Sequence, residues 1–179
     1  MTVIKNLLLA EDDENLGKLL TTFLKAKGFQ VELAKNGKSA YELFNNPKHS
    51  FNLLILDVMM PEMDGFKLAE EIRLLDKNIP FLFLSAKSMK EDKLRGFSVG
   101  ADDYITKPFS MEELLARVNV ILKRIEAKKT NLQEKLHVGR IEYEPGLSLL
   151  HLDEGIKKLT TKENMLLRLL VQNQNELLD

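Results

Sequence analysis

The chain has 179 residues, 44% of them hydrophobic, which is enough to bury one full core and a small second one. Its formal net charge of -1 excludes a surface that is basic throughout, so any contact with nucleic acid requires a local patch. The absence of cysteine excludes disulfides, thiolate metal sites and thiol nucleophiles, and it agrees with a reducing compartment. No apolar run reaches the length of a membrane span, so we expect a soluble, cytoplasmic protein with no membrane partner.

Short apolar runs alternate with helical patterns over the first 125 residues. Each apolar run ends in turn residues, which is typical of a strand buried on both faces. Strands are expected at residues 3–10, 29–34, 53–57, 81–84 and 103–106. Helices are expected at residues 15–27, 38–46, 65–75, 89–99 and from 110 to about 125. The alternation predicts an α/β fold, namely a five-stranded doubly wound parallel sheet with helices on both faces.

One carboxylate stands at the end of the third apolar run. Leu53 to Gly65 reads LLILDVMMPEMDG, so the run leads directly into Asp57 and is then closed by a proline, an aspartate and a glycine. In open α/β sheets, ligands bind at the carboxyl ends of the strands, near the point where the strand order reverses. We therefore expect chemistry at Asp57, although a helix cap or a solvated loop acid is the alternative for one aspartate considered alone.

Four further side chains are expected at the same edge of the sheet. Glu11 and Asp12 follow the first strand, Ser85 ends the fourth and Lys107 follows the fifth. Three carboxylates packed together repel one another unless a cation shares the site, and Mg²⁺ suits oxygen ligands and an incoming phosphate. Asp57 could then attack a phosphoryl group, with the metal and Lys107 neutralising the developing charge and the Ser85 hydroxyl donating a hydrogen bond.

Each of these residues also has a simpler interpretation. Acids after a first strand are often N-caps of the next helix, a role that fits Asp13 or Glu14. Ser85 alone is typical of a turn, and Lys107 alone is typical of a solvated surface. Their expected convergence at one edge favours the functional interpretation.

Four motifs carry a resemblance to a known family. They are LLLAEDDENL at residues 7–16, LLILDVMMPEMDG at 53–65, FLFLSA at 81–86 and GADDYITKPFSMEEL at 100–114. On these motifs, residues 3–125 resemble the receiver domain of two-component response regulators. The resemblance implies a flavodoxin-like receiver fold. It also implies a phosphoacceptor switch with self-catalysed phosphotransfer and slow autodephosphorylation, rather than an enzyme.

The resemblance implies a phosphorylation site at Asp57. This residue would be the phosphoacceptor, forming a 4-aspartylphosphate with a phosphoryl group that comes from a sensor histidine kinase. Mg²⁺ would be the cofactor. Its ligands would be the carboxylates of Glu11, Asp12 and Asp57 and the main-chain carbonyl of Met59.

Three more roles are implied at the neighbouring strands. Ser85 matches the hydroxyl that follows phosphorylation, Tyr104 the aromatic switch whose ring turns inward, and Lys107 the lysine that pairs with the phosphoryl oxygens. The bond between Lys107 and Pro108 is expected to be cis.

The ending DDYITKPFSMEELLARV resembles the OmpR/PhoB subfamily in particular. Its members form homodimers on phosphorylation through the fourth helix, the fifth strand and the fifth helix. Charges on this face suit such an interface, because Lys93 would pair with Glu113, and Asp102 or Asp103 with Arg117. The alternative is that these are ordinary exposed charges, each with little effect on stability.

The sequence pattern changes after the receiver-like region, residues 1–125. Residues 126–136 are charged and polar, and we expect a linker or an extension of the fifth helix. The stretch GRIEYEPGLSLLHLDEGIKKLTTKENMLLRLL then resembles the opening sheet and first helix of a winged-helix DNA-binding domain, with Thr160 and Glu163 as a capping box. The chain ends before any recognition helix. We therefore expect residues 137–179 to be an incomplete part, loosely packed or exchanged with a partner chain, and DNA binding to belong to the full-length protein.

Two classes of function follow. The first is a response regulator in which phosphorylation of Asp57 switches the dimerisation surface and, in the full-length protein, regulates transcription. The second is a Mg²⁺-dependent phosphatase or phosphotransferase with Asp57 as nucleophile, as in haloacid-dehalogenase-type enzymes. Such enzymes place an acid two residues after the nucleophile, where this chain has Met59. A receiver domain locked in one state is a third reading, against which Asp57, Ser85 and Lys107 together argue.

Overall fold

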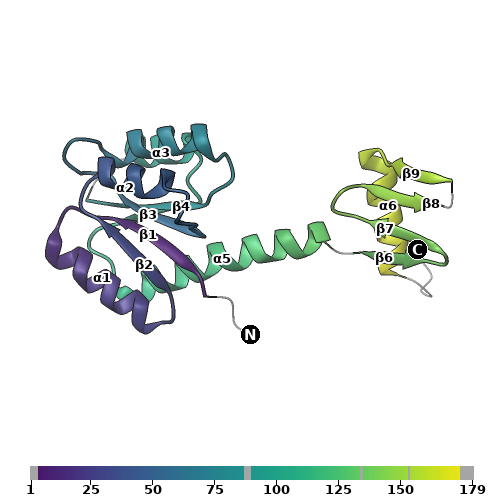
Figure 1. Cartoon of the computed structure of the whole chain (residues 1–179), viewed down its shortest axis with the longest axis horizontal. Coiled ribbons are helices and arrows are strands. Elements are labelled where there is room, and N and C mark those ends of the chain that lie inside the picture. Colours follow the sequence, from purple (N-terminus) through teal and green to yellow (C-terminus); the bar gives the residue numbers. More distant parts are fainter. Residues whose placement is uncertain (1–3, 87–89, 134, 153, 174–179) are drawn as a thin grey trace. The chain divides into compact units, whose positions relative to one another are not determined.

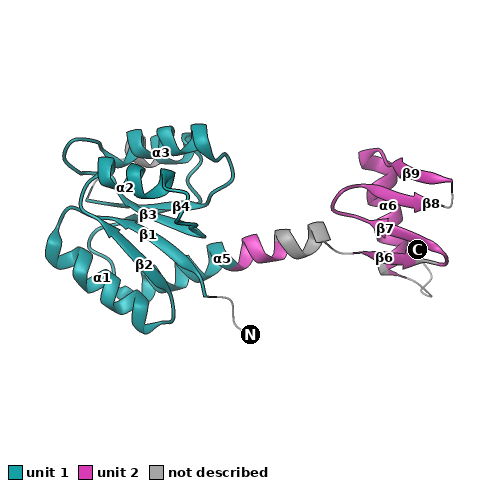
Figure 2. Cartoon of the chain, viewed as in Figure 1, with its two compact units in different colours: residues 1–122 teal, residues 123–179 magenta. Residues whose placement is uncertain are grey.

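A computed structural model of the chain describes residues 4–86, 90–133, 135–152 and 154–173 (Figure 1). The chain divides into two compact units, Met1–Leu122 and Lys123–Asp179, and each has a sheet of its own (Figure 2). No helix in the described ranges is both long and apolar enough to cross a membrane.

The first unit alternates strands and helices. Its strands are β1 (Asn6–Ala10), β2 (Gln30–Ala34), β3 (Leu53–Asp57), β4 (Phe81–Ser85) and β5 (Asp103–Thr106). Its helices are α1 (Glu14–Ala26), α2 (Gly37–Asn45), α3 (Gly65–Leu75), α4 (Lys90–Ser98) and the first part of α5 (Met111–Gln133). The strand pairs of this sheet are parallel and follow the order β2-β1-β3-β4-β5. This topology confirms the predicted fold class.

Helices cover both faces of the parallel sheet. α1 and α5 lie on one face, and α2 and α3 lie on the other (Figure 1). Every residue of β3 is buried, and Leu54 and Leu56 belong to the core cluster that includes Phe66 of α3. Leu53 and Ile55 point to the opposite face, because successive side chains of a strand alternate. Burial on both faces explains why the strands appear in the sequence as continuous apolar runs.

The strand order places the carboxyl ends of β1 and β3 side by side. Ala10 pairs with Leu56, so the residues that follow, Glu11 and Asp57, lie at the same edge. The chain leaves β1 toward α1 on one face and leaves β3 toward α3 on the other (Figure 1). In doubly wound sheets this switch point is where ligands bind.

The loop after β3 holds α3 close to Asp57. The Gly65 amide donates a hydrogen bond to the Val58 carbonyl oxygen over 3.0 Å. The Asp64 side chain caps the helix by accepting from the Lys67 amide over 2.8 Å. A Cβ added at Gly65 would lie 2.2 Å from the Asp57 carbonyl oxygen, which is closer than the two atoms can approach. Only glycine fits at the start of α3, and the close contact fixes the backbone of Asp57.

The second unit contains the last part of α5, followed by a small antiparallel sheet and the helix α6. Its elements are β6 (Leu136–Val138), β7 (Ile141–Glu144), β8 (Leu149–Leu152), β9 (Gly155–Lys158) and α6 (Thr161–Gln172), with strand order β6-β7-β8-β9. Tyr143 is fully buried, and its hydroxyl donates to the Asn164 side-chain oxygen over 2.6 Å. Thr160 and Glu163 form the predicted capping box at the start of α6.

Much of the apolar side of α6 lies exposed. Met165 is 68% exposed, and Leu166, Leu169 and Leu170 each expose about half of their surface. A four-stranded sheet and one helix bury too little apolar surface to cover this stripe. The exposed stripe is compatible with both expectations for residues 137–179, loose packing and exchange with a partner chain. In the segment expected to be a linker, α5 continues to Gln133.

The contact of Gly65 with Asp57 leads to a stability prediction. Gly65→Ala is expected to lower the free energy of unfolding by more than about 2 kcal/mol, because its Cβ meets main chain that cannot move aside. Gly17→Ala, in α1, is the matched control. Its Cβ meets side-chain atoms alone, namely the ends of Leu33 at 3.1 and 3.2 Å and Cγ of Glu11 at 3.7 Å, an ordinary contact distance, and alanine favours helix by about 1 kcal/mol. Urea unfolding measures both variants, and equal losses would contradict the close contact.

Candidate functional site

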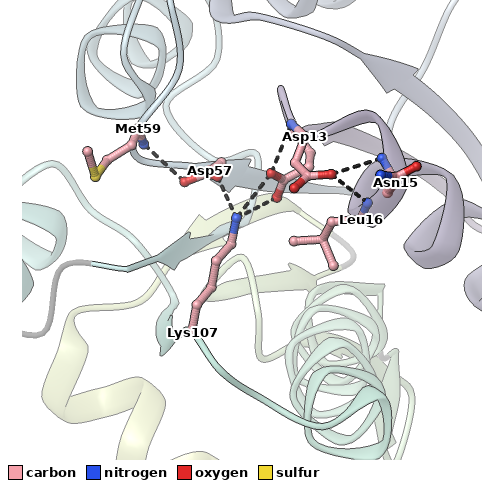
Figure 3. Close-up of polar contacts among 7 residues, drawn as sticks. Asp13, Asn15, Leu16, Asp57, Met59 and Lys107 are labelled. Carbon is pink, nitrogen blue, oxygen red and sulfur yellow. Dashed lines mark hydrogen bonds and ion pairs between the residues drawn. The ribbon is translucent and has the colours of Figure 1, made fainter.

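One ammonium group joins two carboxylates at the carboxyl edge of the parallel sheet. Lys107 Nζ lies 2.6 Å from Asp57 Oδ2 and 2.8 Å from Glu11 Oε2. Figure 3 shows the lysine side chain reaching from the segment after β5 to the end of β3. Three groups that are distant in the sequence therefore meet where the order of the strands predicts.

The two carboxylates are buried. Glu11 is 1% exposed and Asp57 is 4% exposed. Burial raises the pKa of Glu11 from its ordinary value of 4.5 to about 7, while the hydrogen bond from Lys107 lowers it and the charge of Asp57 raises it. Burial alone would lower the pKa of Lys107, but its hydrogen bonds to Asp57 and Glu11 outweigh this, and its pKa is raised. The ammonium of Lys107 thus offsets only part of the cost of burying the Glu11 and Asp57 carboxylates.

Local hydrogen bonds hold the acids in place. The Glu11 amide donates to the Ala34 carbonyl oxygen over 3.0 Å, which extends the pairing of β1 with β2. Asp13 is the N-cap of α1, and its Oδ1 accepts from the amides of Asn15 and Leu16 (Figure 3). The simpler role of a helix cap therefore belongs to Asp13, and the two preceding acids remain available to the site.

The backbone after β3 orients the Asp57 carboxylate. The Met59 amide donates to Asp57 Oδ1 over 3.0 Å (Figure 3). The other carboxylate oxygen, Oδ2, bonds Lys107. Both oxygens are thus held, and a group that approaches Asp57 meets a carboxylate of fixed orientation.

The acidic edge suits a divalent cation. Glu11, Asp12 and Asp57 each offer a carboxylate oxygen, and these oxygens lie within 4.8 Å of one another. Lys107 brings one positive charge against three carboxylates, so a further cation would relieve the repulsion. The oxygen-only ligand set suits Mg²⁺, and the exposed position of Asp12 leaves room for its water ligands.

Two further predicted residues lie at or behind this edge. Ser85 is fully buried at the end of β4, and its carbonyl oxygen accepts from the Lys107 amide over 2.8 Å. Tyr104 is 7% exposed, and its ring lies 6.0 Å from that of Phe83. The Lys107–Pro108 bond is cis, as predicted. Tyr104 therefore occupies an inward position.

The charges predicted for a dimer interface already have partners within the chain. Arg117 bonds Asp103 over 2.8 Å and Glu113 over 2.9 Å. Asp102 accepts a hydrogen bond from the first amide of β4 over 3.2 Å. The side chain of Lys93 lies outside the described part of the chain. The face thus carries both signs of charge, as the sequence indicated.

The second unit contains a cluster that the sequence reasoning missed. Glu142, Glu144 and His151 offer ligand atoms within 4.8 Å of one another, because β7 and β8 pair Glu142 with His151. Lys135 Nζ lies 2.6 Å from Glu142 and 3.3 Å from Glu144. One ammonium therefore already lies against these two carboxylates, and all three side chains are partly exposed to water. The alternation of acids in IEYE was the available signal, but the cross-strand partner depends on the register.

Sequence comparisons match most of the chain. A family model described as Response regulator receiver domain matches residues 7–119. Transcriptional regulatory protein RprY of Bacteroides fragilis is 47% identical over 172 residues, covering 96% of this chain and 72% of that protein. Transcriptional regulatory protein SrrA of Staphylococcus aureus is 32% identical over 178 residues, covering 97% of this chain and 73% of that protein.

Solved structures match the first unit. The receiver domain of the Francisella response regulator 1452 superposes with a TM-score of 0.64 at 36% identity, covering 68% of this chain and 98% of that one. The non-phosphorylated HemR receiver domain from Leptospira biflexa gives a TM-score of 0.62 at 41% identity, covering 66% of this chain and 94% of that one.

The fold, the acidic edge and these likenesses together define a receiver domain. The chain belongs to the response regulator family and carries the receiver domain found in transcriptional regulators of two-component systems.

The Lys107 bridge predicts a pH-dependent loss of stability. In metal-free buffer at pH 8, Lys107→Met is expected to lower the free energy of unfolding by about 3 kcal/mol, because two buried carboxylates lose their cation. The loss shrinks toward pH 5. A carboxyl with a raised folded pKa binds more protons folded than unfolded, so stability falls as pH rises from 4.5 through about 7. Lys107 lowers the pKa of Glu11, so its removal raises that pKa further and makes this fall steeper in the variant than in the wild type.

Lys35→Met is the matched control for this experiment. Lys35 also bonds a carboxylate at 2.6 Å, but its side chain is 67% exposed, and exposed pairs contribute little. Denaturant unfolding at pH 5 and pH 8 gives the comparison. A loss that is the same at both pH values, or no larger than that of Lys35→Met, would refute the role of the bridge.

Proposed function

We propose that Asp57 is the phosphoacceptor of this response regulator and that a sensor histidine kinase is the donor. The observation that carries the proposal is the bridge from Lys107 to the buried carboxylates of Asp57 and Glu11. A buried carboxylate that is fixed at both oxygens and faces the open edge of a doubly wound sheet suits nucleophilic attack on a phosphoryl group.

The chemistry forms one bond and breaks one. The Asp57 carboxylate oxygen attacks the phosphorus of a phosphohistidine, the new O–P bond forms, and the P–N bond breaks as imidazole leaves. Mg²⁺, held by Glu11, Asp12, Asp57 and the Met59 carbonyl, supplies positive charge when it is bound. Lys107 contributes its ammonium to the phosphoryl oxygens, and the Ser85 hydroxyl donates a hydrogen bond to one of them.

Ser85 and Phe83 lie two residues apart on β4 and so share one face of the strand, where Phe83 neighbours Tyr104. The Phe66 and Phe83 rings lie 5.0 Å apart, and the Phe83 and Tyr104 rings lie 6.0 Å apart. A Cβ added at Gly96 would lie 3.0 Å from the Tyr104 ring, so α4 packs directly on the tyrosine. If Tyr104 changes position, α4 has to move with it. We propose α4 as the element whose two positions the phosphorylation switch selects.

The proposed output is a homodimer through α4, β5 and α5. The Arg117 bonds to Asp103 and Glu113 can be exchanged for equivalent bonds to a second copy with little net cost, because exposed ion pairs are individually weak. Lys93 and Asp102 are the other proposed contacts. Such an exchange determines how the two copies align more than how tightly they bind.

The proposed organisation assigns residues 1–125 to the receiver domain, 126–136 to a linker and 137–179 to the N-terminal part of a winged-helix domain. The four-stranded antiparallel sheet followed by α6 supports the last assignment. We propose that the protein acts in the cytoplasm and, like the relatives named as transcriptional regulatory proteins, regulates transcription, and that it does so by binding DNA.

The phosphatase alternative lacks a general acid. Met59 is the second residue after Asp57, and its thioether, 54% exposed, cannot transfer a proton. The geometry therefore favours a phosphorylated switch over an enzyme that turns over a small substrate.

The phosphoacceptor is tested with a small phosphodonor and Mg²⁺. The wild-type chain is expected to gain the mass of one phosphoryl group, and Asp57→Asn is expected to gain none, because an amide is not a nucleophile here. Asp13→Asn is the matched control, since asparagine caps a helix as well as aspartate. Intact-mass spectrometry reads all three. Phosphorylation of Asp57→Asn would show that another residue accepts the group.

The dimer is tested by charge reversal at Arg117. After phosphorylation, the wild-type chain is expected to dimerise, and Arg117→Glu is expected to weaken dimerisation by about tenfold or more because like charges then face one another. Size-exclusion chromatography with light scattering measures the association. Intact mass confirms equal phosphorylation of both proteins. An unchanged dimer in Arg117→Glu would rule out this face.

A further inference from the structure

The loop from Val58 to Asp64 joins the proposed phosphoacceptor to α3. It carries the Met59 amide, which bonds Asp57, and the Met59 carbonyl, which is proposed to bind Mg²⁺. Its far end is held at Gly65 beneath Asp57. Its middle part projects toward the N-terminus of α2, and the contacts made there decide how firmly Met59 is placed.

Asn36 touches this loop while it caps α2. Its Oδ1 accepts from the Ser39 amide over 2.7 Å, which completes the capping box. Its Nδ2 donates to Glu62 Oε1 over 2.9 Å. The Asn36 side-chain amide therefore bonds α2 through its oxygen and the loop through its nitrogen.

Two unusual features of the backbone lie next to this contact. Glu62 has φ of 65°, a left-handed conformation that costs a non-glycine residue free energy. A Cβ added at Gly37 would lie 2.2 Å from the Met63 carbonyl oxygen, so the first residue of α2 lies directly against the loop. The bond from Asn36 to Glu62 offsets part of the cost of the left-handed residue.

Asn36 also lies two residues after Ala34, whose carbonyl oxygen accepts the Glu11 amide. The same short segment thus borders the backbone of one proposed metal ligand, Glu11, and bonds the loop that carries another, Met59. A displacement of this segment would change the spacing of the ligands.

We propose that Asn36 is a positioning residue for the Mg²⁺ site, acting through its hydrogen bond to Glu62 on the loop that carries the Met59 carbonyl. The inference rests on the proposed function of the acidic edge. Ser, Thr and Asp would also cap α2, but an ionised Asp has no donor, and the hydroxyls of Ser and Thr do not extend as far as the Asn36 amide nitrogen that bonds Glu62. The choice of asparagine is therefore explained by the loop and not by the helix.

The test compares variants that separate the cap from the loop contact. Asn36→Ser keeps a capping oxygen, but its hydroxyl lies about one bond length short of the Asn36 amide nitrogen and loses the hydrogen bond to Glu62. Glu62→Met removes the acceptor, and Glu62→Gln removes the charge but keeps the acceptor. Asn46→Ser makes the same chemical change at the opposite end of α2, where Asn46 accepts from the Lys48 amide.

Mg²⁺ affinity of the metal-free full chain is measured by amide chemical shifts, and stability is measured by thermal unfolding. Asn36→Ser and Glu62→Met are each expected to weaken Mg²⁺ binding by about two- to tenfold, the effect of one hydrogen bond. The double variant should be no weaker than the single ones, because both remove the same bond. Glu62→Gln and Asn46→Ser should bind as the wild type does. Before any metal is added, the Met59 amide shift should already differ in Asn36→Ser and Glu62→Met only.

A purely structural role for Asn36 gives a different pattern. Asn36→Ser and Glu62→Met would then lower the unfolding temperature while binding Mg²⁺ as tightly as Asn46→Ser, and the inference would be wrong. If Glu62→Met and Glu62→Gln weakened Mg²⁺ binding equally, the effect would come from the charge of Glu62 and not from its hydrogen bond, and the inference would again be wrong. A wild-type chain that binds no Mg²⁺ would refute the proposed function itself, and with it this inference. Normal wild-type binding with unchanged variants would refute the inference alone.

Discussion

The contact of Lys107 with Asp57 and Glu11 is the constraint on which the rest of the site depends. Burial makes two carboxylates at one edge unfavourable, and the ammonium offsets that cost only in part, since the pKa of Glu11 stays raised to about 7. The remaining negative charge is what gives the edge its affinity for a cation. Under the proposed function, such a site would hold Asp57 ready as the nucleophile and would remain short of positive charge until a metal or a phosphoryl group binds.

The parallel sheet supplies the geometry that this chemistry requires. Its strand order puts Glu11 beside Asp57, and the glycine contact at the start of α3 fixes the backbone behind the carboxylate. The aromatic side chains behind β4 connect the edge to α4. The core around Asp57 is therefore continuous with the packing beneath α4, which is part of the surface proposed to respond to phosphorylation. A change of charge at Asp57 would be transmitted to that surface through these contacts.

The convergence of Asp57 and Lys107 could be predicted from the sequence, because continuous apolar runs identify parallel strands and the carboxyl ends of such strands share one edge. The sequence also predicted that Asp13 or Glu14 caps the helix after the first strand, and Asp13 is the N-cap of α1. The partners of Arg117 within the chain could not be predicted, because they depend on the rotation of α5. The bond of Asn36 to Glu62 required the loop conformation itself, including its left-handed residue.

The most direct test of the account is the location of the phosphoryl group after reaction with a phosphodonor and Mg²⁺. Borohydride reduces an acyl phosphate on aspartate to homoserine, and peptide sequencing by mass spectrometry then locates the modified residue. The account predicts homoserine at position 57 in the wild-type chain and a marked loss of this product in Lys107→Met. Homoserine at another carboxylate, or an equal yield at Asp57 without the lysine, would contradict it.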